Sequence, residues 1–486
     1  MMRRAEGVYN VVVIGAGTAG LVTAAGTAGL GGRVALIERD KMGGDCLNTG
    51  CVPSKALIAS ARRIAQIRRA PDWGLAKQDP RFAFEEVFAR MRARREAIAA
   101  HDSEERFESL GVDVFRGESR FVSPHEVAVG AVVLKGRNVV IATGSRPAIP
   151  PVEGLNKVPY YTNETVFDEL RTKPRRLCVL GGGPVGCELA QVFARLGTAV
   201  TILQRAPQIL EKEDPDAAGL VRRRLEAEGV RVFTGVEAKS VASLADGTSR
   251  LSIEAGDEKK RTVDCDALLV ATGRAPNTEH LDLEKAGVAY GKKGVIVNEH
   301  LQTSQPEIYA AGDITGSFYF THVADAQARV VVRNILFPWK KAKFDDSVVP
   351  WCTYTDPEVA RVGWNEDQAR QGGIACDVWT QSLGELDRAV VESEEEGFAK
   401  VLTKRRSDVI LGVTIVSERA GDLLHEFVLA MKAGIGLKEI SKTIHAYPTF
   451  AELAKKLADS HQRSRLTPFW KRTFSAMYRM RRRFER

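Results

Sequence analysis

The chain has 486 residues, of which 44% are apolar and 27% are charged, a balance typical of globular proteins. At roughly 100–200 residues per domain, this length predicts about three domains. The sequence contains no run of 18 uncharged apolar residues, which argues against a membrane-spanning helix. It contains only seven cysteines, too few for a secreted scaffold built on disulfides. We therefore expect a cytoplasmic protein. The net charge of +8 lies wholly in residues 463–486, which hold nine Lys and Arg and one acid.

The N-terminal region holds the pattern of a dinucleotide-binding unit. An apolar strand is followed by Gly15, Gly17 and Gly20, a small-residue helix and a second apolar strand that ends at Glu38. Glycines let backbone amides approach a pyrophosphate at the helix N-terminus, and an acid after the second strand accepts hydrogen bonds from ribose hydroxyls. This unit is predicted to bind NAD or FAD.

The next segment, GGDCLNTGCVPSKAL, places Cys46 and Cys51 close together after a glycine pair that includes Gly44. Zinc sites usually need four ligands, often with CxxC spacing, and a disulfide across so short a loop adds little stability. Redox chemistry is favoured, because Cys51 lies at the start of a predicted helix whose N-terminus lowers a thiol pKa. Lys55, one turn further on, adds positive charge. We therefore predict no metal site at these cysteines; a structural metal site and a structural disulfide are the alternatives.

A second unit of the same design begins at Gly181 and continues through Gly183 and Gly186. Two fingerprints, each within a strand–turn–helix–strand frame, are a strong signal of dinucleotide binding. Its second strand ends in Gln204 and Arg205 instead of an acid. This favours the 2′-phosphate of NADPH, with NADH as the alternative. Arg205 could also be a solvated surface charge.

Three further strand–turn segments belong to these units. NVVIATGSRP and ALLVATGRAPN have the same form, and their turns hold Thr143, Gly144 and Gly273 as candidate cofactor contacts. A third apolar strand ends at Asp313, whose carboxylate could reach a ligand hydroxyl in the cleft. A turn-capping role is the alternative for Asp313.

The C-terminal part differs from the rest. From about Val348, short alternating stretches precede helical ones, which predicts an α+β domain without a fingerprint. Beyond it, apolar residues of the tail recur at three- and four-residue steps: Phe469, Trp470, Phe474, Met477 and Tyr478. A basic amphipathic helix of this kind suits peripheral contact with an anionic membrane surface. The alternatives are a solvated or frayed terminus, a helix packed on its own dimer and, less favoured, a nucleic-acid contact.

The layout resembles the FAD-dependent pyridine nucleotide–disulfide oxidoreductases, such as lipoamide dehydrogenase, glutathione reductase and mercuric reductase. The family segment GGxCxNxGCxPSK is present, and the similarity extends from residue 8 to about residue 465. The resemblance implies that the first fingerprint binds FAD and that Asp313 holds the ribityl chain. It also implies that Cys51 faces the flavin while Cys46 meets the substrate.

The resemblance further implies that Lys55 pairs with Glu188 beside the flavin, and that the last domain forms a homodimer whose active site is shared across the interface. The expected fold class is α/β, with two Rossmann-like dinucleotide-binding domains and a C-terminal α+β dimerisation domain. The expected domains are an FAD-binding domain (1–150 and 280–347), an NAD(P)H-binding domain (151–279), a dimerisation domain (348–465) and the tail (466–486).

One segment departs from the disulfide reductases of the family, which end in HPTxxE with the His as general base and the Glu as its orienting partner. Here HAYPTFAE places Tyr447 where that His would be and Glu452 at the Glu, with His445 two positions early. A tyrosine, with a pKa of about 10, is a poor base at neutral pH. Mercuric reductases resemble the chain at this step, but they carry a C-terminal cysteine pair, and this chain has no cysteine after Cys376.

The predicted function is therefore that of an FAD-dependent NAD(P)H oxidoreductase. It would pass electrons through the Cys46–Cys51 pair to a small-molecule or metal-ion acceptor, in the manner of a mercuric reductase. A dihydrolipoamide dehydrogenase or other disulfide reductase is the second hypothesis. A surface-docked binding or scaffold flavoprotein is an alternative of another class.

Overall fold

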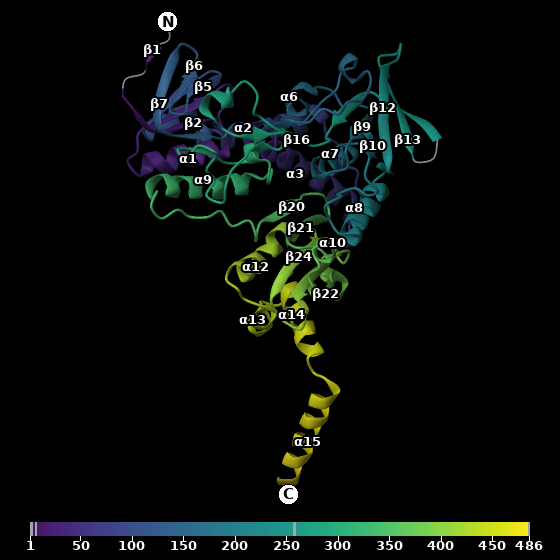
Figure 1. The fold of residues 1–486 in the computed structure, drawn as a ribbon. Helices are drawn as coiled ribbons and strands as arrows, with labels where there is room; N and C mark the ends of the chain where they lie inside the picture. The colour runs from purple at the N-terminus through teal and green to yellow at the C-terminus, as the bar shows by residue number, and fades with distance from the viewer. Residues whose placement is uncertain (1–2, 5–6, 256–258, 485–486) are drawn as a thin grey trace. The chain divides into compact units, whose positions relative to one another are not determined.

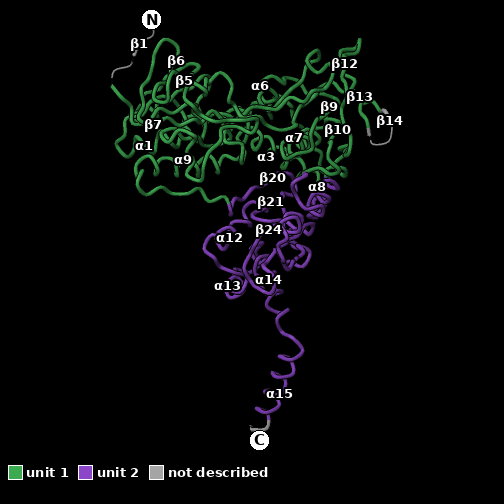
Figure 2. The backbone as a smooth tube through the Cα atoms, in the orientation of Figure 1, with its two compact units in different colours: residues 1–70, 77–210, 225–346 green, residues 71–76, 211–224, 347–486 purple. Residues whose placement is uncertain are grey.

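The computed structural model describes residues 3–4, 7–255 and 259–484 (Figure 1). Outside the described residues lie residues 1–2 and 5–6 of the expected FAD-binding domain, residues 256–258 of the expected NAD(P)H-binding domain and residues 485–486 of the tail. The chain divides into two compact units, coloured separately in Figure 2. The first comprises residues 1–70, 77–210 and 225–346, and the second comprises residues 71–76, 211–224 and 347–486.

The first unit opens with a mixed sheet in the order β4-β3-β2-β7-β6-β5, in which β1 and β19 also pair with β7. Figure 1 labels β1, β2, β5, β6 and β7 of this sheet. Side chains of β2 alternate between two cores, with Val12 and Ile14 in one and Val11 and Val13 in the other. Both faces are therefore covered, as is usual for parallel strands. Its strands are β1 (Arg3–Arg4), β2 (Tyr9–Ile14), β3 (Val34–Glu38), β4 (Val112–Arg116), β5 (Ser119–Ser123), β6 (Glu126–Val129), β7 (Val132–Ile141) and β19 (Ile308–Ala310). Two helices, α1 (Thr18–Gly29) and α9 (Thr321–Leu336), pack on each other and contribute to the second of these cores.

The second Rossmann-like region of this unit has a parallel sheet in the order β11-β10-β9-β15 and an antiparallel sheet in the order β12-β13-β14. Its strands are β9 (Arg176–Leu180), β10 (Ala199–Gln204), β11 (Arg231–Thr234), β12 (Val236–Ser243), β13 (Ser249–Ala255), β14 (Lys259–Cys265) and β15 (Ala267–Val270). Short antiparallel pairs complete the unit: β8 (Ser145–Pro147) with β16 (Arg274–Pro276), and β17 (Tyr290–Gly291) with β18 (Gly294–Val295). The two Rossmann-like regions of the expected fold class are thus present.

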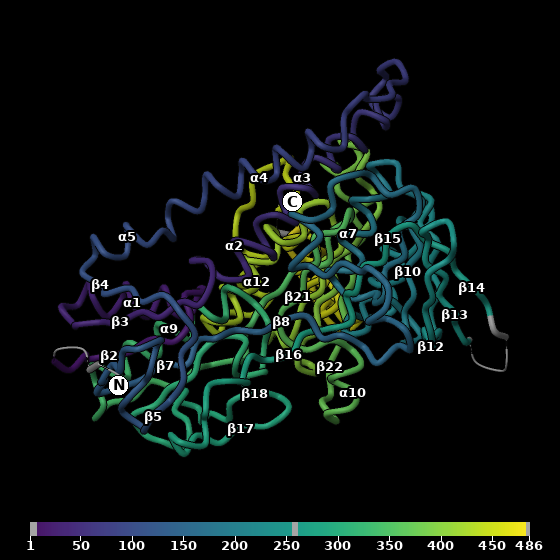
Figure 3. Tube along the Cα trace, turned by 90° about the horizontal axis from the view of Figure 1, so that it is seen from above, coloured from purple at the N-terminus to yellow at the C-terminus, as the bar shows by residue number. Residues whose placement is uncertain are grey.

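The cysteine segment forms two helices of the first unit, α2 (Gly44–Asn48) and α3 (Cys51–Arg68). α3 packs against α4 (Phe84–Ala99) and α7 (Pro184–Arg195), as Figure 3 shows. The rings of Phe88 and Phe193, 6.4 Å apart between centroids, join α4 to α7. The segment that carries the cysteines is therefore held by a packed helix of the first unit. Two shorter helices of this unit are α5 (Glu104–Ser109) and α6 (Val166–Glu169).

The second unit is built on an antiparallel sheet in the order β20-β21-β24-β23-β22, and it confirms the α+β domain expected from the sequence. Val401 and Ile415 of the sheet are buried with Phe427 and Leu457 of the covering helices. The strands are β20 (Pro350–Thr353), β21 (Glu358–Gly363), β22 (Cys376–Ser382), β23 (Phe398–Lys404) and β24 (Ile410–Ser417). The helices are α10 (Glu366–Gln371), α11 (Asp387–Val391), α12 (Ala420–Lys432), α13 (Leu437–Lys442), α14 (Glu452–Ser464) and α15 (Pro468–Phe484).

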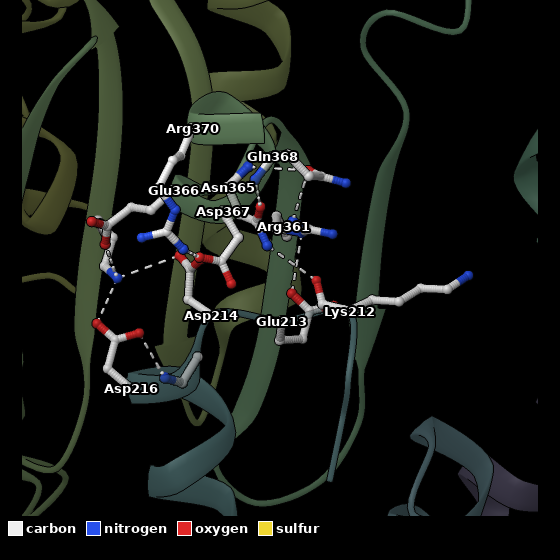
Figure 4. A network of polar contacts seen from close by, with 12 residues as sticks. Lys212, Glu213, Asp214, Asp216, Arg361, Asn365, Glu366, Asp367, Gln368 and Arg370 are labelled. Carbon is white, nitrogen blue, oxygen red and sulfur yellow. Dashed lines mark hydrogen bonds and ion pairs between the residues drawn. The ribbon is translucent and has the colours of Figure 1, made fainter. Parts of the chain in front are cut away.

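Buried ion pairs join residues 211–224 to this sheet (Figure 4). The same segment contains the start of α8 (Pro215–Ala227). Arg361 Nε lies 3.1 Å from Glu213 Oε2, and both side chains are almost fully buried. Lys400 Nζ lies 3.3 Å from Asp214 Oδ2 and 2.6 Å from Glu366 Oε1. Burial raises the pKa of the Glu213 carboxyl, and the Arg361 guanidinium opposes that effect. The segment is thus part of the second unit through paired charges.

Replacing Arg361 by methionine is expected to lower the free energy of unfolding of this unit by about 3–5 kcal/mol, because it removes the buried cation opposite Glu213. Chemical denaturation monitored by tryptophan fluorescence measures the loss. Arg224→Ala is the matched control, since Arg224 pairs with the half-exposed Glu396 and surface pairs contribute less than about 1 kcal/mol. Equal losses in the two variants would contradict the assignment.

Candidate redox active site

The two cysteines lie at the start of adjacent helices, with Cys46 in α2 and Cys51 as the first residue of α3. Both are free thiols, Cys46 half-buried and Cys51 exposed. Cys51 Sγ lies 3.5 Å from the hydroxyl oxygen of Thr321, the first residue of α9. In the part of the chain that the structure describes, no three His, Cys, Asp or Glu side chains gather as they would around a metal ion.

The two thiols differ in acidity. A hydrogen bond from Cys46, together with the Thr321 hydroxyl and the Lys55 charge, lowers the pKa of Cys51 to about 6. The pKa of Cys46 is raised, because Cys46 donates that hydrogen bond and is itself desolvated. In the dithiol state the negative charge therefore resides on Cys51 and the proton on Cys46. The charged sulfur is the more nucleophilic and the more easily oxidised of the two.

The positive charge beside the thiolate is held in place by an ion pair. Lys55 Nζ lies 2.8 Å from Glu188 Oε2, and Glu188 is buried on α7. Because α3 packs on α7, the pair joins the helix that bears Cys51 to the helix that follows the second fingerprint. A buried carboxylate of this kind requires a cationic partner, which fixes the direction of the Lys55 side chain.

Asp45 anchors the loop between the two cysteines. Its Oδ1 accepts hydrogen bonds from Thr49 Oγ1 at 2.7 Å and from Asn163 Nδ2 at 3.0 Å. Its Oδ2 lies 3.0 Å from an Arg274 guanidinium nitrogen. Sequence reasoning missed Asn163 and Arg274. The available signal for Arg274 was a basic residue directly after the ATG turn.

The same arginine connects the cysteine loop to Asp313. Arg274 Nε donates to Ser145 Oγ at 2.7 Å, and Ser145 Oγ donates to Asp313 Oδ2 at 2.5 Å. Burial raises the pKa of Asp313, while the bond from Ser145 opposes that shift. The carboxylate therefore belongs to this polar cluster, and its Oδ2 also lies 3.6 Å from Arg274 Nε.

The first fingerprint forms a cradle that only glycine can line. Gly15 has a φ of +101°, and a Cβ on Gly20 would lie 1.8 Å from the Gly15 carbonyl oxygen. A Cβ on Gly44 would lie 2.6 Å from the Gly17 Cα. α1 begins directly after Gly17 with no side-chain cap, so its first amides face the space beside the glycines. This arrangement fits the pyrophosphate of FAD.

The second fingerprint repeats this geometry. Gly181 has a φ of +106°, and a Cβ on Gly186 would lie 2.0 Å from the Gly181 carbonyl oxygen. α7 begins directly after Gly183, again without a side-chain cap. The cradle fits the pyrophosphate of a nicotinamide dinucleotide in the same way.

The two units differ at the end of the second strand. Glu38 Oε2 accepts a hydrogen bond from the Ala16 amide at 2.7 Å. In the second unit, Gln204 Oε1 accepts from the Gly182 amide at 2.8 Å. A neutral amide thus occupies the place of the acid, and the exposed Arg205 follows it.

Hydrogen bonds join the two ATG turns to each other. Thr143 Oγ1 donates to the Asn277 carbonyl oxygen at 2.9 Å, and Asn277 Nδ2 returns a bond to the Thr143 carbonyl oxygen at 2.9 Å. Gly144 and Gly273 have φ values of +68° and +137°, which favour glycine. The hydroxyl of Thr143 is therefore used to join the two turns.

Tyr447 lies in the second unit, where its hydroxyl donates to Asp387 Oδ2 at 2.8 Å. That bond raises the pKa of Tyr447, so the phenol stays protonated at neutral pH. Glu452 is the first residue of α14, and its Oε2 is buried without a hydrogen-bond partner among the described residues. His445 Nε2 lies 2.9 Å from Glu426 Oε1.

Comparisons with known proteins agree with this arrangement. Residues 9–328 match the family described as pyridine nucleotide-disulphide oxidoreductase, and residues 349–458 match its dimerisation domain. A mercuric reductase of Staphylococcus aureus is 35% identical over 463 residues, which cover 93% of this chain and 82% of that protein. A dihydrolipoyl dehydrogenase of Chlamydia muridarum is 36% identical over 453 residues, which cover 92% and 95% of the two chains.

Among solved structures, the Cu(II) complex of the HOCl-induced flavoprotein disulfide reductase RclA from Escherichia coli is similar, with a TM-score of 0.83. It is 28% identical in sequence, and the match covers 93% of this chain and 99% of that chain. The dimerisation-domain match ends at residue 458, before α15 begins.

Proposed function

Because the chain belongs to the pyridine nucleotide-disulphide oxidoreductase family, we propose that it carries electrons from NADPH to a soft metal ion such as Hg(II) or Cu(II). It is a homodimeric enzyme that uses FAD and NAD(P)H. The family consists of enzymes, which leaves no support for a purely scaffolding flavoprotein. The observation that carries the metal-ion proposal is Tyr447, a protonated phenol at the position of the general base.

The cysteine pair delivers the electrons in this proposal. Bound FAD supplies the transfer of a hydride equivalent from the nicotinamide to the Cys46–Cys51 disulfide. Reduction of that disulfide takes up two electrons and one proton, and it leaves a Cys51 thiolate beside Lys55 and a Cys46 thiol. Hg(II) then receives two electrons, or two Cu(II) ions receive one electron each, as the pair returns to the disulfide and releases one proton. Thiolates are preferred ligands of soft metal ions.

A metal acceptor places a smaller demand on Tyr447 than a disulfide acceptor does. Reduction of a disulfide substrate needs a group that exchanges protons with the substrate sulfurs at neutral pH. A phenol with a raised pKa does this poorly. Reduction of a metal ion has no such leaving group. The similarity to a mercuric reductase and to RclA, which was solved as a Cu(II) complex, supports the same class of acceptor.

Dihydrolipoamide dehydrogenase activity is the second candidate. The contact between His445 and Glu426 favours it, since a carboxylate of α12 lies beside a histidine of the Tyr447 segment.

A screen of acceptors with NADPH in stopped flow separates the two functions, with Cys46→Ser as the control. We expect Hg(II)- or Cu(II)-dependent oxidation of NADPH that this variant lacks. Fast turnover with lipoamide and none with metal ions would reverse the assignment.

We also propose NADPH as the preferred nucleotide, because Gln204 replaces the acid that would repel a 2′-phosphate and Arg205 adds a cation. Arg205→Ala is expected to raise KM for NADPH about 10- to 100-fold, the range of one charge-assisted hydrogen bond, and to leave NADH nearly unchanged. Steady-state kinetics with both nucleotides measure this. Equal losses would mean that Arg205 supports the fold, and Gln204→Glu should shift the preference towards NADH.

Finally, we propose that the protein works in the cytoplasm and meets the inner membrane surface peripherally. No helix among the described residues combines the length and the apolar content that crossing a bilayer requires. The support for peripheral contact is α15, whose exposed aromatic and basic side chains the redox chemistry does not use.

A further inference from the structure

α15 leaves its apolar side chains uncovered. From Pro468 to Arg482, every side chain except that of Thr473 is exposed. Trp470 stacks on Phe474 with 5.7 Å between ring centroids, and Phe469 meets Trp470 edge-on at 5.6 Å. The exposed large side chains of the helix are Phe469, Trp470, Phe474, Met477, Tyr478 and Met480. An aromatic cluster without a cover marks an interaction surface.

Helical spacing groups three of these six side chains in a row that is mostly separate from the charges. Trp470, Phe474 and Met477 follow one another at steps of four and three residues, which places them on one side of the helix. Lys471 and Arg482 lie outside this row, as do Arg472 and Arg479 on the opposite side. Arg481 is the exception, one turn beyond Met477 at the C-terminal end. α15 therefore carries an apolar row on one side and cations on the other, while Tyr478 lies among the cations, next to Lys471 and Arg482.

Rings and cations also share a hollow beside the helix. Its lining residues are Leu466, Lys471, Phe474, Ser475, Tyr478, Arg481 and Arg482. Guanidinium and ammonium groups bind phosphate, while aromatic rings suit the boundary between headgroups and acyl chains. The sequence of α15 holds six Lys and Arg and no acid, so nothing on the helix repels a phosphate-rich surface.

We propose that α15 docks on the surface of an anionic phospholipid bilayer, with Trp470, Phe474 and Met477 at headgroup level and the basic side chains against lipid phosphates. The inference deepens the peripheral location proposed above and is independent of the acceptor. A bilayer surface uses both the aromatic row and the charge, whereas nucleic acid would need only the charge. A second copy of α15 is disfavoured as the partner, because it carries the same six positive charges.

Co-sedimentation of the dimeric holoenzyme with vesicles tests this proposal. We expect binding to vesicles of equal parts phosphatidylglycerol and phosphatidylcholine, weak binding to phosphatidylcholine alone, and partial loss at physiological salt. A chain that ends at Thr467 should stay in the supernatant. Replacing Lys471, Arg472 and Arg479 together by glutamine should weaken the partition about 100-fold. Replacing Trp470, Phe474 and Met477 together by serine should weaken it at least about 10-fold.

All of these variants should oxidise NADPH in solution at the wild-type rate, so a failure to dock and a failure of the redox proposal give different results. If every form stays in the supernatant with anionic lipid, the proposal is wrong. Equal binding of double-stranded DNA by the wild type and the serine variant, without vesicle binding, would identify nucleic acid as the partner instead. A change of dimer mass on truncation at Thr467 would assign α15 to the dimer and overturn the proposal as well.

Discussion

Replacing Cys51 by serine is expected to abolish the long-wavelength charge-transfer absorption of the two-electron-reduced holoenzyme, and turnover with it. The reason is that Cys51 carries the thiolate of the reduced pair, since Cys46 donates a hydrogen bond to it and Lys55 adds positive charge. Anaerobic titration with dithionite or NADPH, followed by absorbance, measures the band. A band that persists in the Cys51→Ser protein would show that the roles of the two sulfurs are reversed.

The same band should depend on pH with a definite sign. The pKa of Cys51 is lowered from its ordinary value to about 6, so the thiolate is the stable form above that pH. In the reduced wild-type enzyme the absorption is therefore retained at neutral and alkaline pH and lost as the pH falls through about 6. A midpoint near the ordinary value of about 8.5 for a cysteine would mean that Cys46 and Lys55 do not act on this thiol.

Cys46→Ser is the matched control for these experiments. It leaves Cys51 as a single thiol that no disulfide can consume, so the band should appear in the oxidised protein without any reductant. The serine hydroxyl can still donate a hydrogen bond to the Cys51 sulfur, which should keep its pKa below the ordinary value. Turnover with any acceptor should nevertheless be lost, because the second sulfur of the redox pair is missing.

The parts of the site that were predictable from the sequence are those whose chemistry is local. Gly15 and Gly181 repeat one backbone conformation because each fingerprint needs a positive φ and a close helix–strand approach. The helix that starts at Cys51 was likewise readable from its own segment. In these stretches the spacing of a few neighbouring residues determines the structure.

The contacts that were missed join residues far apart in the chain. Thr321 reaches Cys51 across 270 positions, and Asn163 reaches Asp45 across 118. Neither partner carries a local signature, since a threonine at the start of a helix and an asparagine in a turn are ordinary. Such contacts depend on which sheet ends the fold brings together. The pairing of Arg361 with Glu213 has the same character, because it depends on a segment that joins a later sheet.

Gln204 lies between these two cases. Its position at the end of the second strand marked the absence of an acid, and that was enough to favour NADPH. Its hydrogen bond to the Gly182 amide could be seen only in the structure. Gln204 therefore has the same structural role as Glu38, whose carboxylate accepts a hydrogen bond from the Ala16 amide. The substitution therefore changes the charge of the site while keeping its geometry.

Replacing Tyr447 by histidine is expected to raise turnover with lipoamide or glutathione disulfide by ~10²–10⁴-fold, the contribution of a well-matched general acid–base group. The wild-type phenol donates to Asp387, which raises its pKa, whereas a histidine titrates at about 6.5 and could exchange protons with a substrate sulfur at neutral pH. The buried carboxylate oxygen of Glu452 has no hydrogen-bond partner among the described residues and could orient the new imidazole.

Steady-state kinetics of NADPH oxidation with each disulfide measure this gain, and two variants control it. Tyr447→Phe removes the hydroxyl without adding a base, so it should leave the disulfide rate low. Adding Glu452→Gln to the histidine variant should cancel part of the gain, because the orienting charge is lost. Metal-dependent oxidation of NADPH should change only a few-fold in Tyr447→His and Tyr447→Phe, since reduction of a metal ion needs no proton at this position. A wild-type rate of disulfide reduction equal to that of a dedicated reductase would contradict this prediction. A folded histidine variant without any gain would contradict it too, since the base at this position would then not be what limits the reaction.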